Sequence, residues 1–187
     1  GLQAAGVRFD RRGVTVDEGM QTTASGIYAA GDVTGGVMLA HRAMRQGVVA
    51  AENALGGHSR MDDRKVPSCI FSIPEAASVG LSEQQARAQG YDVRVGRFPF
   101  ADNGKALALG ESEGFVKVVA EARYGEVLGL HIVGAHASDL ILEGALALAL
   151  EATLDELEAT VHPHPALGEA VAEAALAAQG RALHALP

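Results

Sequence analysis

The stretch "GFVKVVAEARYGEVLGLHIVG", residues 114–134, decides the fold of this protein. Residues 115–121 and 127–134 are rich in β-branched side chains and carry alternating apolar positions, a pattern typical of strands. Between them, "ARYGE" includes a glycine and polar side chains that suit a turn. The stretch therefore predicts a β-hairpin within an antiparallel sheet.

The segments before the hairpin predict further parts of the same layer. "PSCIFSI" (67–73) and "DVRVGRFPF" (92–100) have the apolar composition of strands. A short helix is expected between them, from Ser82 to Gln89. The sheet should therefore contain strands from both sides of this helix.

Three helices are expected after the hairpin, which makes the fold α+β. Ser138 is the expected N-cap of the first, "DLILEGALALALE" (139–151), whose apolar residues lie on nearly every face. Such a helix should be buried between the sheet and another layer. Thr153 and Glu156 have the spacing of a capping box for a second, short helix. The third helix is "ALGEAVAEAALAAQ" (166–179), which a glycine ends.

The first third of the chain predicts the end of an α/β domain. Short strands are expected at 14–16 and 27–30, and the second runs directly into Gly31-Asp32. A compact loop then leads to a helix that begins near Leu39 and stops at a Gly-Gly pair. The polar run "GGHSRMDDRK" that follows marks a boundary, which gives domains of 1–64 and 65–187.

Composition narrows the function classes. The 187 residues carry a net charge of −8 without long charged blocks, which argues against a nucleic-acid partner. No apolar run reaches the roughly 20 residues that span a bilayer, so no membrane partner is expected and the cytoplasm is the default location. The single cysteine, Cys69, excludes an internal disulfide. The chain begins without Met and reads as part of a longer protein.

The motif "HPHPALGE", residues 162–169, is the strongest candidate for a catalytic or metal-binding site. Pro165 disfavours helix at His164 and suits the first helical turn itself, so the imidazole can fold back toward Glu169. On one continuous helix, a separation of five residues would place the two side chains about 140° apart. Three interpretations stay open: a catalytic His–Glu pair, half a metal site made by His162 and His164, or a solvated turn before a helix. The remaining histidines show no metal-ligand spacing, so no metal is predicted.

Asp32 is a second candidate because of its position. A carboxylate at the carboxyl end of a strand in an α/β sheet lies where such folds bind ligands, often through sugar hydroxyls. The helix that begins near Leu39 would direct its positive end at the same region. The alternative is a common Gly-Asp turn without function.

Three segments together resemble one family, the FAD-dependent pyridine nucleotide-disulfide oxidoreductases. "TTASGIYAAGDVTGGVMLAHRAMRQG" is similar to its second flavin-binding segment, and "VPSCIFSIPEAASVGLSEQQA" to the opening of its interface domain. "HPHPALGEAVAEAA" resembles its C-terminal His-x-His-Pro motif. The segments stand in family order. Among subfamilies, the Met-Leu-Ala-His run at 38–41, combined with the two histidines of the C-terminal motif, most resembles dihydrolipoamide dehydrogenase.

The resemblance implies a fold and a set of roles. It implies an interface (dimerisation) domain with an antiparallel sheet and flanking helices, preceded by the last segment of an α/β FAD-binding domain. Asp32 would accept ribityl hydroxyls of FAD, and the backbone of Met38, Leu39, Ala40 and His41 would approach the flavin ring. His164 would deprotonate a substrate dithiol, Glu169 would orient it, and NAD would accept the electrons. The active site would be shared across a homodimer, and a lipoyl domain of a 2-oxoacid dehydrogenase-type complex would be a partner.

The family also needs a Gly-rich FAD fingerprint, a Cys-x4-Cys pair and a Gly-rich NAD segment, none of which occurs in this sequence. We therefore expect the chain to be a C-terminal portion that by itself is inactive and does not hold FAD tightly. Three alternatives are kept: another flavin disulfide or quinone reductase, a non-catalytic dimerisation module, and a metal-binding module. Cys69 is expected to be a small buried apolar residue.

Overall fold

The computed structural model describes residues 1–185. The chain folds as two units, Gly1–Asp63 and Arg64–Pro187. None of the helices in the described residues is long and apolar enough to cross a membrane.

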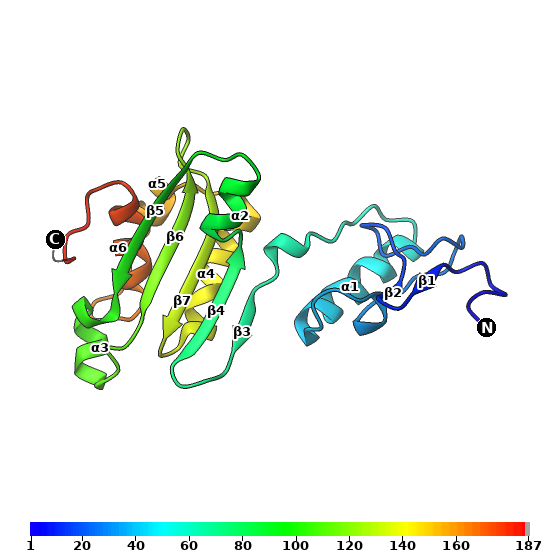
Figure 1. Ribbon diagram of the computed structural model, residues 1–187, viewed down its shortest axis with the longest axis horizontal. Helices are drawn as coiled ribbons and strands as arrows, with labels where there is room; N and C mark the ends of the chain where they lie inside the picture. Colours follow the sequence, from blue (N-terminus) through cyan, green and yellow to red (C-terminus); the bar gives the residue numbers. More distant parts are fainter. Residues whose placement is uncertain (186–187) are drawn as a thin grey trace. The chain divides into compact units, whose positions relative to one another are not determined.

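The second unit is built on a five-stranded antiparallel sheet (Figure 1). Its strands, in the order β3-β4-β7-β6-β5, are β3 (Ser68–Ile70), β4 (Glu75–Gly80), β7 (Val127–Gly134), β6 (Phe115–Glu121) and β5 (Val93–Pro99). The hairpin expected from residues 114–134 is confirmed as β6 and β7, which pair from Phe115 opposite Val133, with a register shift between Val119 and Ala120. The hairpin occupies the centre of the sheet, as its apolar faces require.

Five helices accompany the sheet in the described part of this unit. They are α2 (Glu83–Ala88), α3 (Gly104–Leu109), α4 (Ala137–Leu150), α5 (Leu154–Ala159) and α6 (Glu169–Ala178). The helix expected between the outer strands is α2, and the capping box of Thr153 and Glu156 begins α5 as predicted. No sequence pattern had predicted α3. The fold class expected from the sequence is confirmed.

The main core lies between one face of the sheet and helices α4 and α6. Figure 1 shows both helices behind the sheet, with α2 in front of it. Alternate residues of the strands, such as Val116, Val118 and Ile132, point into this core, where they join Ile141 of α4 and Ala174 of α6. The opposite face has only a small cluster under α2, which includes Val119 and Leu128. This division follows from the two-residue period of a strand.

Two details differ from expectation. Ser138 is not the N-cap of α4: the helix begins at Ala137 after His136, and the N–H of Ser138 donates instead to the Glu75 carboxylate at 2.9 Å. A carboxylate from the neighbouring strand thus satisfies a free amide at the helix start, which is the task that a cap performs. The expected strand at 67–73 ends at Ile70, because the following residues turn toward the unforeseen strand β4.

The close packing of α6 on β5 depends on Gly96. A Cβ at this position would lie 1.9 Å from the carbonyl oxygen of Ala174 and 2.4 Å from the backbone nitrogen of Ala178. We expect Gly96→Ala to lower the free energy of unfolding by about 1–3 kcal/mol, because the helix must move away from the sheet. Urea denaturation of the chain measures this change. The control is Gly104→Ala, where a Cβ meets nothing within 4 Å; equal stability losses in both variants would contradict the argument.

The first unit contains one long helix, α1 (Ala40–Ala54), and a short ribbon of β1 (Phe9–Asp10) with β2 (Gly13–Val14). The helix beginning near Leu39 is confirmed, with Leu39 as its N-cap. The predicted strand at 27–30 is wrong for the described residues. It pairs only through an isolated bridge from Tyr28 to Gln21, and a strand requires a neighbour along its length.

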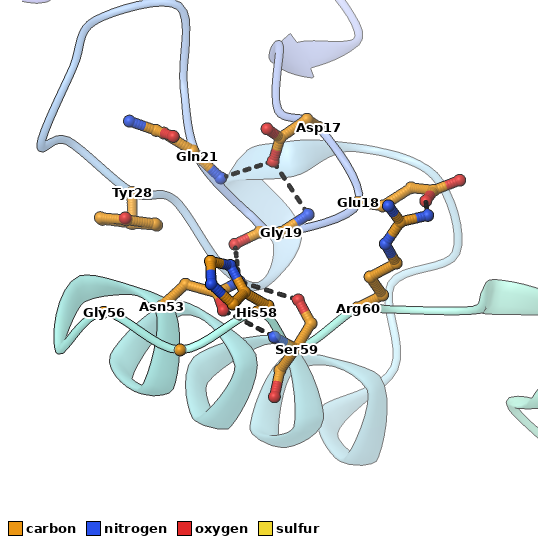
Figure 2. A pocket seen from close by; sticks show the side chains of 11 residues that line it. Asp17, Glu18, Gly19, Gln21, Tyr28, Asn53, Gly56, His58, Ser59 and Arg60 are labelled. Carbon is orange, nitrogen blue, oxygen red and sulfur yellow. Dashed lines mark hydrogen bonds and ion pairs between the residues drawn. The ribbon is translucent and has the colours of Figure 1, made fainter.

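Asn53, near the end of α1, fastens this unit together. Its side-chain amide donates to the carbonyl oxygens of Gly19 at 2.9 Å and Ser59 at 2.8 Å, and its oxygen accepts from the Ser59 N–H (Figure 2). Asp17 binds two further backbone amides in the same loop. Many of the groups that line the polar pocket around these residues bond to one another, and the pocket contains none of the predicted site residues. We assign it a structural role.

Candidate active site

His164 and Glu169 lie in direct contact. The Nδ1 atom of His164 is 2.8 Å from Oε1 of Glu169, and the other carboxylate oxygen accepts the N–H of Ala166 at 2.8 Å. Glu169 is the first residue of α6, and the bond between His164 and Pro165 is cis. The imidazole folds back over the helix start to reach Glu169, although the helix begins at Glu169 and not at Pro165 or Ala166 as the sequence analysis expected.

The two side chains differ in exposure and electrostatics. The His164 side chain is 79% exposed, and within the described residues its Nε2 makes no hydrogen bond. The Glu169 side chain is 26% exposed. Burial raises the pKa of Glu169, but the hydrogen bonds from Ala166 and His164 outweigh it, so the pKa is lower than usual. The result is an ionised carboxylate behind an imidazole whose outer nitrogen faces solvent.

His162 has a different environment. Its side chain is only 10% exposed, with Nε2 2.9 Å from Glu143 of α4 and Nδ1 2.9 Å from the carbonyl oxygen of Thr160. The hydrogen bond with Glu143 raises the pKa of His162. Because both ring nitrogens are occupied, His162 holds the segment against α4. Among residues 1–185, no group of three or more His, Cys, Asp or Glu side chains could hold a metal ion.

A further His–Glu pair, which the sequence pattern did not indicate, joins α6 to the C-terminal segment. Glu173, one turn after Glu169, is buried and accepts the N–H groups of Leu183 and His184, while Nδ1 of His184 lies 2.7 Å from its Oε1. The separation of eleven residues gave no local signal for this pair. Glu173 fastens the returning C-terminal segment to α6.

The other predicted site residues gather in the first unit around the start of α1. Asp32 is exposed in a short turn, and within the described residues its carboxylate makes no hydrogen bond or ion pair. A groove lined by residues of the β1–β2 ribbon also contains Asp32 and Met38. The first backbone amides of a helix have no hydrogen-bond partner within the helix. In α1 the N-cap residue is Leu39, whose apolar side chain makes no hydrogen bond to these amides. Ala40 and His41 form the first turn.

These residues fit a flavin. An unbonded carboxylate, a groove and a long helix presenting its positive end are the features that accept sugar hydroxyls and a partly negative ring edge. The structure also places Arg42 and Gln46 beneath this loop, which the sequence analysis did not single out. Their signal was weak, because a polar residue on a helix is ordinarily exposed.

Cys69 occupies β3 and packs partly against the core. Burial raises the pKa of its thiol, and the nearby Glu75 adds to the effect. This environment disfavours the thiolate that redox chemistry requires.

Comparison with known families assigns the chain to one of them. Residues 66–175 match the model of the pyridine nucleotide-disulphide oxidoreductase dimerisation domain, and residues 1–47 match the pyridine nucleotide-disulphide oxidoreductase model. This chain belongs to the pyridine nucleotide-disulphide oxidoreductase family. The resemblance seen in the sequence is confirmed, and the five-stranded sheet with α4 and α6 is the dimerisation domain of this family.

Individual members of this family are similar over nearly the whole chain. A dihydrolipoyl dehydrogenase from Bacillus subtilis is 49% identical over 185 residues, which cover 98% of this chain and 39% of the relative. The crystal structure of LpdA from Mycobacterium tuberculosis superposes with a TM-score of 0.88 at 37% identity, covering 94% of this chain and 39% of that one. The flavoprotein disulfide reductase RclA from Escherichia coli has a TM-score of 0.83 at 27% identity, with coverage of 93% and 41%. The chain thus spans about 40% of the length of the relatives it matches.

Proposed function

We propose that this chain is the C-terminal part of an FAD-dependent dihydrolipoyl dehydrogenase, which oxidises dihydrolipoamide and reduces NAD. The contact between His164 and Glu169 carries the proposal, because it is a base and its orienting carboxylate in the geometry that thiol chemistry needs. The similarity to dihydrolipoyl dehydrogenases supports the choice of substrate. A lipoyl domain is the corresponding partner, and the cytoplasm stays the expected location.

His164 acts as the general base. Only a thiolate attacks a disulfide, and a thiol with a pKa of about 8.5 is mostly protonated at neutral pH. With Nδ1 donating to Glu169, Nε2 is left as the acceptor that takes the proton from a dithiol. The ionised Glu169 holds this tautomer and stabilises the positive charge that the ring gains.

The first unit would hold FAD in part. Asp32 would accept hydroxyls of the ribityl chain, and the backbone of Met38 to His41 at the start of α1 would bind the flavin ring. Bound FAD supplies the two-electron acceptor, while the positive end of α1 favours negative charge on the reduced ring.

The protein acts as a homodimer, in which His164 serves the flavin of the partner subunit. Two exposed apolar groups of the second unit support this assembly. Leu142, Leu146 and Leu150 form a stripe along α4, between 57% and 70% exposed, and the turn after β3 presents Phe71 and Ile73. The sequence predicted α4 to be buried between two layers, and a dimer partner supplies the second layer.

We expect a double change of Leu142 and Leu146 to Glu to convert a dimeric chain into a monomer. Both side chains point away from the core, so the variant should keep its circular dichroism spectrum while its sedimentation coefficient falls. Leu107→Glu is the control, because this leucine is also 59% exposed but lies on α3. A monomeric unmodified chain, or a double variant that stays dimeric, would contradict the proposed interface.

The substrate is tested with the full-length protein. We expect it to be purified with bound flavin and to reduce NAD with dihydrolipoamide much faster than it reduces glutathione disulfide or a quinone. The likeness to RclA makes another flavin disulfide reductase the second candidate. A preference for glutathione disulfide or a quinone would establish that alternative, and a protein without flavin would exclude both.

A further inference from the structure

A buried cation lies beneath the loop that contains Asp32. Arg42 of α1 is 7% exposed and is the only buried Lys or Arg among residues 1–185. Gln46, one turn later, is 1% exposed. Burying such groups costs free energy unless each donor and acceptor has a hydrogen-bond partner. The partners of Arg42 and Gln46 therefore indicate the structural role of the two side chains.

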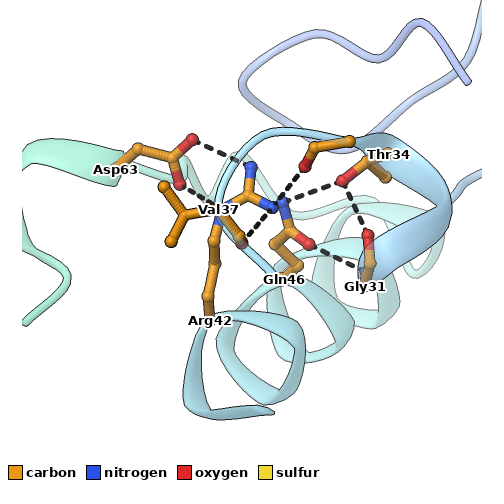
Figure 3. A network of polar contacts seen from close by, with 7 residues as sticks. Gly31, Thr34, Val37, Arg42, Gln46 and Asp63 are labelled. Atoms are coloured by element: carbon orange, nitrogen blue, oxygen red, sulfur yellow. Dashed lines mark hydrogen bonds and ion pairs between the residues drawn. The ribbon is translucent and has the colours of Figure 1, made fainter. Parts of the chain in front are cut away.

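Arg42 links two segments of the first unit. Its Nε and Nη2 atoms form a forked ion pair with Asp63, at 2.8 and 2.9 Å, and Nη1 donates to the carbonyl oxygens of Gly35 at 3.0 Å and Val37 at 3.4 Å (Figure 3). The rigid guanidinium can reach a carboxylate and two carbonyls at once, which an ammonium group cannot do in this geometry. The loop is thereby fixed at its carboxyl end.

Gln46 fixes the other end of the loop. Its side-chain oxygen accepts the N–H of Gly31 at 2.8 Å, and its nitrogen lies 3.4 Å from Oγ1 of Thr34. Thr34 in turn donates to the carbonyl oxygen of Gly31 at 2.8 Å. Asp32 therefore lies between two anchored residues, Gly31 and Thr34. Figure 3 shows the contacts of both with each other and with Gln46.

The loop needs these anchors because of its composition. Gly35 and Gly36 have φ values of 69° and 74°, which glycine adopts readily but only as one of many conformations. A loop of this kind loses much conformational entropy when it becomes ordered. If Arg42 and Gln46 order it in advance, a ligand at Asp32 does not have to supply that free energy on binding.

We propose that Arg42 and Gln46 are positioning residues, which hold the loop 31–37 in its flavin-binding conformation and tie it through Asp63 to the segment that leaves the first unit. The inference rests on the proposed function, since it assigns the loop to FAD. The two side chains act through the backbone and need no contact with the flavin themselves.

The first test uses the chain without flavin. Hydrogen exchange of the Gly31, Thr34 and Gly35 amides should become at least tenfold faster in Arg42→Gln and Gln46→Leu. Arg45→Gln, which removes an exposed charge from the same helix, should leave these rates unchanged. Equal exchange in Arg42→Gln and Arg45→Gln overturns the positioning role, and melting of the whole unit is recognised by faster exchange throughout α1.

The second test uses the full-length protein and measures the dissociation constant of FAD by flavin fluorescence. We expect it to rise at least tenfold in Arg42→Gln and in Asp63→Asn, and to take an intermediate value in Arg42→Lys, which keeps the charge but not the fork. Arg42→Lys with unchanged affinity would show that charge alone matters and would overturn the proposal. An unmodified protein that binds no FAD would instead refute the proposed function, while the exchange experiment would still report on the loop.

Discussion

Turnover of dihydrolipoamide by the full-length protein is expected to fall by roughly 10²- to 10⁴-fold when His164 is replaced by Gln, the range that a positioned base contributes. Gln lacks a nitrogen that can take up a proton, but it can still accept a hydrogen bond from the surroundings. The replaced side chain is 79% exposed, so the fold and the flavin content should be preserved. The assay is NAD reduction at neutral pH, with the flavin absorbance recorded for each sample.

The pH dependence of turnover distinguishes a damaged fold from a missing base. As the pH rises toward 9, an ordinary thiol ionises without help, so the deficit of His164→Gln should shrink. A structural defect would not be relieved in this way. His184→Gln is the matched control, because this histidine also contacts a glutamate of α6 and is 68% exposed; its turnover should change by less than about threefold, because a contact at an exposed position contributes little. Unchanged turnover in His164→Gln would refute the role of base.

Replacing Glu169 by Gln is expected to lower turnover by about 10²-fold or more, through the protonation state of the neighbouring ring. The amide can still accept the N–H of Ala166 with its oxygen, which leaves its NH2 group facing Nδ1 of His164. A donor at that position favours the tautomer with the proton on Nε2. General-base catalysis requires this nitrogen to be unprotonated. The carboxylate that stabilises the charged ring is lost in the same step.

This explanation predicts a spectroscopic signature. In the chain labelled with ¹⁵N-histidine, the ring nitrogen shifts of His164 should report a proton on Nδ1 in the unmodified protein at alkaline pH and on Nε2 in Glu169→Gln. Glu158→Gln, which removes a partly buried carboxylate that pairs with Arg181, should leave the tautomer of His164 unchanged. A large loss of turnover without a change of tautomer would show that Glu169 acts in another way.

The pattern of the central hairpin was enough to predict the sheet. Strands β6 and β7 are rich in β-branched residues, and buried apolar residues such as Val116, Val118 and Ile132 recur at alternate positions along them. Strand β4 was not predicted because it is composed largely of small residues. Helix α3 was not predicted because it lacks the capping box that begins the equally short α2 and α5. Short elements of this kind are determined by the packing around them more than by their own periodicity.

By itself, the sequence determined the antiparallel hairpin, the helices with capping boxes and the approach of Glu169 to His164, since each depends on residues close together in the chain. Only the tertiary structure decided the use of His162, the pairing of Glu173 with His184, and the anchoring of the Asp32 loop by Arg42 and Asp63. These contacts join residues that are 11 to 21 positions apart. The physical reason is that a buried polar side chain is stabilised by partners that folding brings to it, and no local pattern of residues specifies which partners those will be.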